Sequence, residues 1–123
     1  MEATYILETA ETIRRQLVAG SPTNVILSWG PEQFVATTLK GMAALKFKVN
    51  GRLHKGYVVI AYNEADYYEI YLMDMDKNIV KCVSDEVYCD ELSDVIDTAI
   101  ERGYDDEEYM KFCEKAFSEL FFR

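Results

Sequence analysis

Few side chains in this sequence have the type and spacing that catalysis needs, and the single histidine is the first of them. A general base needs a nucleophile within hydrogen-bond reach and a third group that orients it. His54 stands in the run Leu-His-Lys-Gly without a Gly-x-Ser-x-Gly motif, a Gly-rich phosphate loop or a second histidine. This pattern favours a half-buried strand histidine, and it leaves open a catalytic or small-molecule pocket shared by His54 and Tyr57.

Metal ligands are the second kind of chemistry to consider. Four side chains match ligand positions 1, 3, 5 and 12 of a calcium-binding loop: Asp74, Asp76, Asn78 and Asp85. Ile79 stands where that loop needs glycine, and the aspartate at the twelfth position is too short for the usual bidentate binding. The run is therefore interpreted as a polar hairpin turn. The cysteines lack the spacing of a zinc site, so the sequence predicts no metal and no cofactor.

Carboxylates form a regular pattern in the second half of the chain. Four of them recur at i, i+4, i+7 and i+11, which lines one edge of a helix: Asp90, Asp94, Asp97 and Glu101. Another acidic run occupies residues 105–108. Such runs are typical of a solvated helix face, helped by acids near helix N-termini. Two functional interpretations stay open, namely a surface for a basic partner and an imitation of a nucleic-acid backbone.

Lysines interleave with apolar residues in the first half of the chain. In the expected hairpin, Lys46, Lys48 and Lys55 share one face with Leu53 and Tyr57. Lysines on a solvent face protect a sheet from edge pairing. The same three lysines around an aromatic ring would also suit a phosphate or an acidic peptide. A further alternative is self-association, in which the basic hairpin of one copy meets the acidic helices of another.

Tyrosines are concentrated on the predicted strands. Alternation places Tyr67 and Tyr71, with Met73, on the face of their strand that points away from Tyr68. If helices cover the Tyr68 face, these residues form an outward apolar patch of the kind that marks interfaces. The alternative is that the N-terminal helix covers them.

The charge balance limits the class of partner. Net charge is −9, and it is uneven: residues 1–60 hold seven Lys/Arg against four Asp/Glu, whereas residues 61–123 hold six against eighteen. A nucleic-acid backbone needs a dominant basic face, so this balance argues against direct nucleic-acid binding. Apolar runs are too short for a membrane span, and no secretory signal pattern opens the chain. With an odd number of cysteines, the expected location is the cytoplasm.

Hydrophobic periodicity predicts a single α+β domain over residues 1–123. It has an N-terminal helix, an antiparallel β-meander of four to five strands and a C-terminal helical hairpin packed on the sheet. Residues 32–40 stay open between a helical turn and an irregular edge. The predicted helices cover residues 4–19, 92–100 and 105–120, and the predicted strands cover residues 24–29, 42–49, 52–62, 67–73 and 79–83.

The Asn-Gly pair at residues 50–51 predicts a two-residue hairpin turn, because both turn positions need a positive φ. In that register Phe47 faces His54, and Lys46 faces Lys55.

Several segments together resemble small uncharacterised α+β proteins encoded by bacterial mobile and accessory genetic elements. The segments are Trp29-Gly30, residues 45–51, residues 53–56 and Tyr88 to Asp97. The resemblance spans residues 24–100. It implies a bacterial cytoplasmic setting, and it supplies no catalytic residue. The sequence as a whole predicts a non-enzymatic interaction module that binds a protein partner or a second copy of itself.

Overall fold

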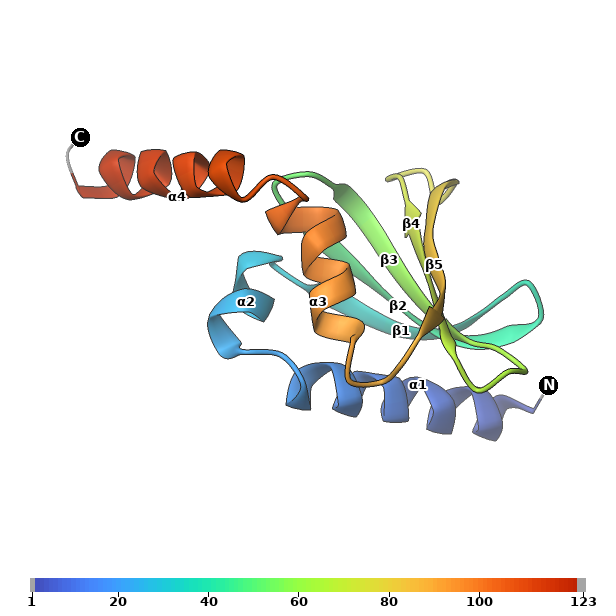
Figure 1. Ribbon diagram of the computed structural model, residues 1–123. Helices are drawn as coiled ribbons and strands as arrows, with labels where there is room; N and C mark the ends of the chain where they lie inside the picture. Colours follow the sequence, from blue (N-terminus) through green and yellow to red (C-terminus); the bar gives the residue numbers. More distant parts are fainter. Residues whose placement is uncertain (1, 122–123) are drawn as a thin grey trace.

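The computed structural model describes residues 2–121, with the backbone alone for residues 117 and 119–121. Its helical segments are α1 (Ala3–Ala19), α2 (Thr23–Ser28), α3 (Leu92–Asp97), η1 (Thr98–Arg102) and α4 (Asp106–Phe121). Its strands are β1 (Glu32–Leu39), β2 (Met42–Asn50), β3 (Lys55–Tyr62), β4 (Tyr68–Met73) and β5 (Ile79–Val87). The strands form one antiparallel sheet in the order β1-β2-β3-β4-β5 (Figure 1). This confirms the predicted α+β class, with its N-terminal helix, meander and C-terminal helices.

One face of the sheet carries the main core. Helices α1 and α3 lie on this face, with α2 beside them (Figure 1). The helical residues that enter the core recur at helical spacing, as an amphipathic helix requires. They are Ala10, Ile13 and Leu17 of α1, and Leu92, Ile96 and Ile100 of α3 and η1. Among residues 2–121, no helix is both long enough and apolar enough to span a membrane.

Residues 24–29 form helix α2 and its C-cap, so the strand predicted there is wrong. Val25 and Ile26 pack against the core and Trp29 is fully buried, whereas Leu27 is 69% exposed. Positions i, i+1 and i+4 share one face of a helix, while a strand would have buried Leu27 together with Val25. A short apolar run does not distinguish the two structures by its pattern alone.

The ambiguous segment 32–40 supplies edge strand β1 and the start of a tight turn. Leu39 pairs with Met42, which leaves Lys40 and Gly41 as the two turn residues. Their φ angles are 52° and 78°, and two successive positive values are what a type I′ hairpin needs. The two-residue turn of this sheet therefore joins β1 to β2.

The β2–β3 connection is longer than the Asn-Gly pair suggests, and the predicted register is wrong. Asn50 pairs with Lys55, and Phe47 faces Val58, four residues beyond the predicted His54. Because the shift is an even number of residues, the side chains within the two strands keep their predicted faces. Leu53, predicted on the lysine face, lies in the loop instead. Gly51 has a different role here, since a Cβ at this position would lie 2.3 Å from the carbonyl oxygen of Ile100.

Helix α4 begins beyond Gly103 and runs away from the sheet (Figure 1). Asp105 caps it, because its Oδ1 accepts a 3.1 Å hydrogen bond from the backbone N–H of Glu108. Aspartate at the N-cap with glutamate three residues later is an acidic variant of the capping box, and this contact is one half of it. Apolar residues at helical spacing predict an apolar stripe on this helix that includes Phe112, Phe117 and Leu120. Phe112 is 39% exposed. The side chains of Phe117 and Leu120 lie outside the described residues.

Candidate functional site

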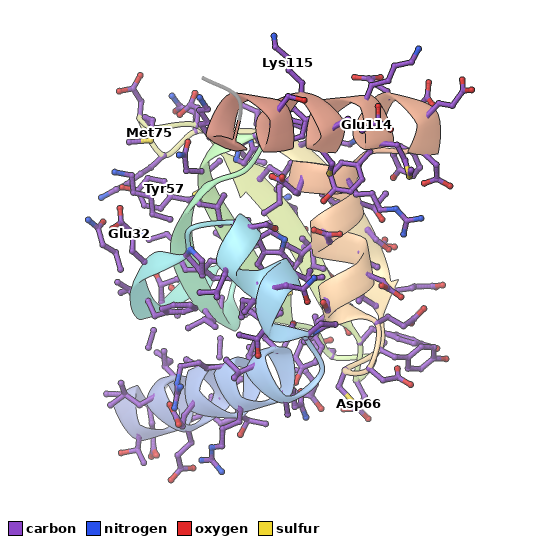
Figure 2. The ribbon with its side chains drawn as sticks, turned by 90° about the vertical axis from the view of Figure 1, so that its left-hand side faces the viewer. Glu32, Tyr57, Asp66, Met75, Glu114 and Lys115 are labelled. Atoms are coloured by element: carbon purple, nitrogen blue, oxygen red, sulfur yellow. The ribbon has the colours of Figure 1, made fainter. Side chains whose placement is uncertain are left out.

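The face of the sheet opposite α1 and α3 carries a basic and aromatic surface. We call it the lysine–tyrosine face, and it consists of Lys40, Lys46, Lys48, Lys55, Lys77, Tyr57 and Tyr71. Lys48 lies opposite Tyr57, and Lys46 lies opposite Val59, whose other neighbour is Tyr71. Directly paired residues share a face, so the register assembles this surface. Figure 2 shows Tyr57 and Glu32 projecting from the sheet on the side away from α3.

The floor of this face is apolar and closed. Ala44, Val59 and Ala61 are at most 1% exposed, and Tyr71 is 4% exposed. Among the described residues, this second cluster contains strand residues and turn-flanking side chains but no helical residue. Small residues in the centre of the sheet thus lie beneath longer side chains around them. The face therefore combines a buried apolar layer with the ammonium groups of its five lysines.

The ammonium groups sit close to the tyrosine rings. The Nζ atom of Lys46 is 5.3 Å from the Tyr57 ring centroid, and that of Lys77 is 6.0 Å from the same centroid. Lys40 Nζ is 4.7 Å from the centroid of Tyr71. These are cation–π distances, so the rings hold the lysine side chains near the sheet.

Tyr71 is held in its neutral form. Its hydroxyl donates a 2.5 Å hydrogen bond to Oε1 of Glu69, and this bond together with burial raises the pKa of Tyr71 well above its ordinary value. Among the described side chains, Lys48 is the one lysine of the face with an ion-pair partner, 3.8 Å from Glu32. Four ammonium groups of the face are therefore available to an external carboxylate.

The structure divides the four carboxylates of the predicted acidic stripe. Asp90 and Asp94 are exposed, in the turn before α3 and in its first turn. Asp97 accepts a 2.8 Å hydrogen bond from the indole Nε1 of Trp29. Glu101 is only 6% exposed, and burial raises the pKa of its carboxyl. Two of the four thus face solvent, while the other two have partners inside the fold.

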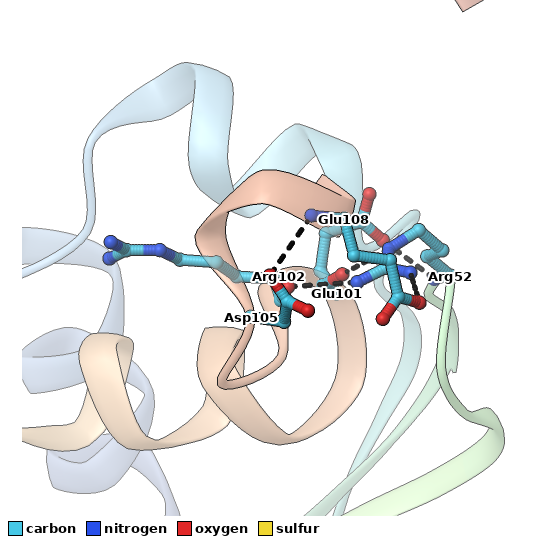
Figure 3. A network of polar contacts seen from close by, with 5 residues as sticks. All are labelled: Arg52, Glu101, Arg102, Asp105 and Glu108. Atoms are coloured by element: carbon cyan, nitrogen blue, oxygen red, sulfur yellow. Dashed lines mark hydrogen bonds and ion pairs between the residues drawn. The ribbon is translucent and has the colours of Figure 1, made fainter. Parts of the chain in front are cut away.

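Glu101 belongs to a network centred on Arg52 in the β2–β3 loop (Figure 3). Its Oε2 accepts a 2.7 Å hydrogen bond from the backbone N–H of Arg52. The Arg52 guanidinium donates to the carbonyl oxygens of Glu101 and Arg102 at 2.9 and 2.8 Å, and to Oε1 of Glu108 at 3.1 Å. The arginine fork therefore joins the β2–β3 loop to the end of η1 and to the first turn of α4.

The wide turn of η1 explains why the loop is held there. The backbone N–H of Gly103 donates to the carbonyl of Thr98, a spacing of five residues. The following carbonyls lack partners within the helix. Leu53 donates its N–H to the carbonyl of Ile100 at 2.7 Å, and Arg52 takes the next two carbonyls. Loop and turn thus satisfy each other's backbone groups.

His54 and Tyr57 meet through one contact. His54 Nε2 is 3.3 Å from the carbonyl oxygen of Tyr57, and the imidazole is half-buried. Neither residue lines any of three hollows found among the described residues. The hollow nearest in sequence, about 320 Å³, is lined by Arg52, Lys55 and Glu101 among others. The pocket predicted around His54 and Tyr57 stays a prediction.

Asp74 closes the β4–β5 turn as an acceptor of backbone hydrogen bonds. Its Oδ1 accepts from the N–H groups of Asp76 and Asn78, both at 2.9 Å. The carboxylate therefore builds the turn itself. The described residues contain no group of three or more His, Cys, Asp or Glu side chains that could hold a metal ion.

The two larger hollows lie at the opposite end of the sheet from the β2–β3 loop. One, of about 500 Å³, is called here the tyrosine groove; it is lined by Tyr5, Glu8, Thr9, Thr12, Gln16, Tyr62, Asp66, Tyr68, Tyr88 and Cys89. The other, of about 600 Å³, shares Tyr5, Tyr62 and Asp66 with it. Tyr67, expected beside Tyr71, instead packs against Tyr88 at 5.0 Å between ring centroids.

Sequence reasoning missed the tyrosine groove. Five of its residues, at positions 5, 8, 9, 12 and 16, share one side of α1 at helical spacing, beside the buried stripe of that helix. That spacing was the available signal. The pairing of Tyr62 with Tyr68 across the β3–β4 turn then supplies the floor of the groove.

No match was found to any protein-family model, curated protein or solved structure.

Proposed function

We propose that this protein is an interaction module that binds an acidic segment of a partner protein on the lysine–tyrosine face. The observation that carries the proposal is the set of five lysines on a sheet face that the described helices leave open. Only one of these lysines has an ion-pair partner among the described side chains. An acidic segment would supply the carboxylates that the fold does not.

The lysine stems and Tyr57 support a protein ligand in particular. Ala44, Ala61 and Val59 are at most 1% exposed, so apolar side chains of an extended acidic segment would contact the longer side chains above them, including the methylene stems of the lysines. Tyr57 places an aromatic ring beside Lys46 and Lys77 on the same face. Aromatic residues are enriched at the centres of protein interfaces.

A long polyanion fits the molecule less well. Net charge is −9, so most of the surface repels a phosphate backbone. Nucleic-acid binding draws its affinity from many simultaneous phosphate contacts. A short acidic segment touches only the basic face and avoids the acidic remainder.

The direct test uses a short fluorescein-labelled Glu/Leu peptide and fluorescence anisotropy. The variant carries Lys46→Gln and Lys55→Gln. The matched control carries Lys111→Gln and Lys115→Gln, which make the same charge change on exposed positions of α4. We expect the first pair to weaken binding about tenfold and the control to change it less than about twofold, because the charges are local to the face.

Salt and competitors decide between partner classes. Affinity is expected to fall as ionic strength rises from about 0.01 to 0.15 M, since the attraction is screened. Absence of saturable binding at the lowest salt, or equal effects of both double variants, would contradict the proposal. Tighter binding of a DNA duplex than of the peptide would assign the face to nucleic acid instead. Light scattering that shows dimers sensitive to Lys46→Gln and Lys55→Gln would make the partner a second copy.

A further inference from the structure

The tyrosine groove differs in charge from the lysine–tyrosine face. Its walls hold four tyrosines and two carboxylates, Glu8 and Asp66, and none of its ten lining residues is a lysine or an arginine. Aromatic rings present negative charge on their faces. The groove is therefore lined by rings, two carboxylates and neutral side chains; the nearest basic lining residue is Lys40, in the adjoining hollow that shares Tyr5, Tyr62 and Asp66.

Three segments build the groove: α1, the β3–β4 hairpin and the residues after β5. Tyr5 and Glu8 project from the N-terminal half of α1, and Tyr5 is 46% exposed. Tyr88 lies after β5 and is 55% exposed. Tyr68 is only 7% exposed and forms part of the floor. Exposed rings at the rim and a buried ring beneath them leave a hollow of about 500 Å³ open to a ligand.

Hydrogen bonds orient the floor tyrosines. Tyr62 donates its hydroxyl to Oδ1 of Asp66 at 2.5 Å, and Tyr68 donates to Oε1 of Gln16 at 2.5 Å. The two rings lie 5.6 Å apart at 54°. A tyrosine whose hydroxyl donates to an anion has a more electron-rich ring, which strengthens attraction of a cation. The hydroxyls are thus engaged by the protein, which fixes the orientation of both rings.

We infer that the tyrosine groove binds a small quaternary ammonium ion, the trimethylammonium head of a choline-like molecule. Rings and carboxylates without basic residues suit a bulky, weakly hydrated cation, which is bound by cation–π attraction and long-range charge. This binding activity is independent of the proposed acidic partner. Asp66 lies at the far end of the molecule from Glu114 and Lys115 of α4 (Figure 2), so α4 leaves the groove free.

The probe is choline, followed by amide and side-chain NMR shifts of the whole chain. We expect saturable shifts at Tyr5, Tyr62, Asp66 and Tyr88, with a dissociation constant on the order of 1 mM. The matched ligand is 3,3-dimethylbutan-1-ol, which has the same shape without the charge. It is expected to bind about fivefold more weakly or worse, because cation–π attraction is lost.

Substitutions at the rim of the groove test whether choline binding depends on the aromatic ring of Tyr5. Tyr5→Leu removes an exposed ring and is expected to weaken choline binding about fivefold, whereas Tyr5→Phe keeps the ring and the affinity. Tyr104→Leu, at an 84% exposed tyrosine outside the groove, is the control and should change nothing.

The charge is tested at Asp66. Its φ is 64°, a left-handed conformation that asparagine adopts readily. Asp66→Asn therefore keeps the turn and the acceptor for Tyr62 while it removes the anion. We expect choline affinity to fall about threefold or more, and the affinity for the neutral alcohol to stay unchanged.

Several results would overturn the inference. They are a lack of saturable shifts with choline, equal affinity for the neutral alcohol, and equal losses with Tyr5→Leu and Tyr5→Phe. Much tighter binding of a trimethyllysine peptide than of choline would contradict a small-molecule ligand. The groove would then bind a methylated side chain of another protein. None of these outcomes depends on the acidic-peptide experiment, because the two surfaces use different side chains.

Discussion

The indole Nε1 of Trp29 donates a 2.8 Å hydrogen bond to Oδ1 of Asp97, and so ties the end of α2 to the end of α3. The Trp29 side chain is fully buried in the main core. Trp29→Phe keeps an aromatic ring but removes the donor and leaves the carboxylate without it. We expect a loss of about 1–3 kcal/mol in the free energy of unfolding, measured by urea denaturation and circular dichroism.

Asp97→Asn is the matched change on the other partner. It keeps an oxygen acceptor for the Trp29 indole while it removes the charge. The expected loss is below about 1 kcal/mol, since the neutral hydrogen bond remains. A loss as large as that of Trp29→Phe would show that the charge, and not the acceptor, stabilises this contact.

Glu101→Gln tests the buried carboxylate beneath the β2–β3 loop. Burial raises the pKa of Glu101 above its ordinary value of 4.5, so the folded state holds the carboxyl proton more tightly than the unfolded state. The carboxylate's contribution to the free energy of unfolding therefore falls as pH rises from about 4.5 through the higher folded pKa. Glutamine keeps the oxygen that accepts from Arg52 and does not titrate. We expect the variant to gain stability relative to the wild type across that window.

The control for this position is Glu101→Ala, which removes the acceptor. It leaves the backbone N–H of Arg52 without its partner, at an expected cost of about 1–3 kcal/mol at neutral pH. Urea denaturation at several pH values measures both variants. Equal destabilisation by glutamine and alanine would contradict the role given to the acceptor oxygen.

Gly51→Ala tests the close approach of the β2–β3 loop to η1. The new Cβ would lie 2.3 Å from the carbonyl oxygen of Ile100, and both backbones are fixed by hydrogen bonds. We expect a loss of about 2 kcal/mol or more, measured as a shift of the urea midpoint. Gly41→Asn is the comparison, because Gly41 has a positive φ but open space around it. Asparagine should be tolerated there to within about 1 kcal/mol.

Arg52→Lys tests the attachment of α4. Lysine keeps the charge but lacks the fork that reaches two carbonyls and Glu108 together. We expect amide hydrogen exchange in the first turns of α4 to speed up about tenfold, while the main core changes less. The control is Arg102→Lys, since Arg102 forms an exposed pair with Asp106 whose contribution is small. Equal effects on α4 would contradict the fork's role.

The antiparallel strands could be predicted because successive side chains of a strand point to opposite faces of the sheet. Residues 45–49 of β2 alternate between apolar side chains on the helix-covered face and lysines on the open face, and that alternation is visible directly in the sequence. The face of each lysine on β2 was therefore predictable. Its neighbour across the strand pair was not, because the neighbour depends on loop length.

Loop length depended on a contact distant in the sequence. Asn-Gly is a strong local signal, but Gly51 is required by the carbonyl of Ile100, and the loop extends to meet η1. The acidic stripe shows the same limit: a helical wheel groups Glu101 with Asp94, whereas tertiary contacts bury Glu101 against Arg52. Tertiary contacts prevailed over local pattern at both places.

The mutual dependence of the β2–β3 loop and η1 also has an evolutionary consequence. Neither segment can change length alone, because an inserted or deleted residue would leave buried carbonyls of one or donors of the other unpaired. Homologous chains that keep the wide turn should also keep a small residue at position 51 and a guanidinium at position 52. Positions 51, 52 and 101 should then covary as a group across such a family, while the turn at 40–41 should vary independently among residues that adopt a positive φ.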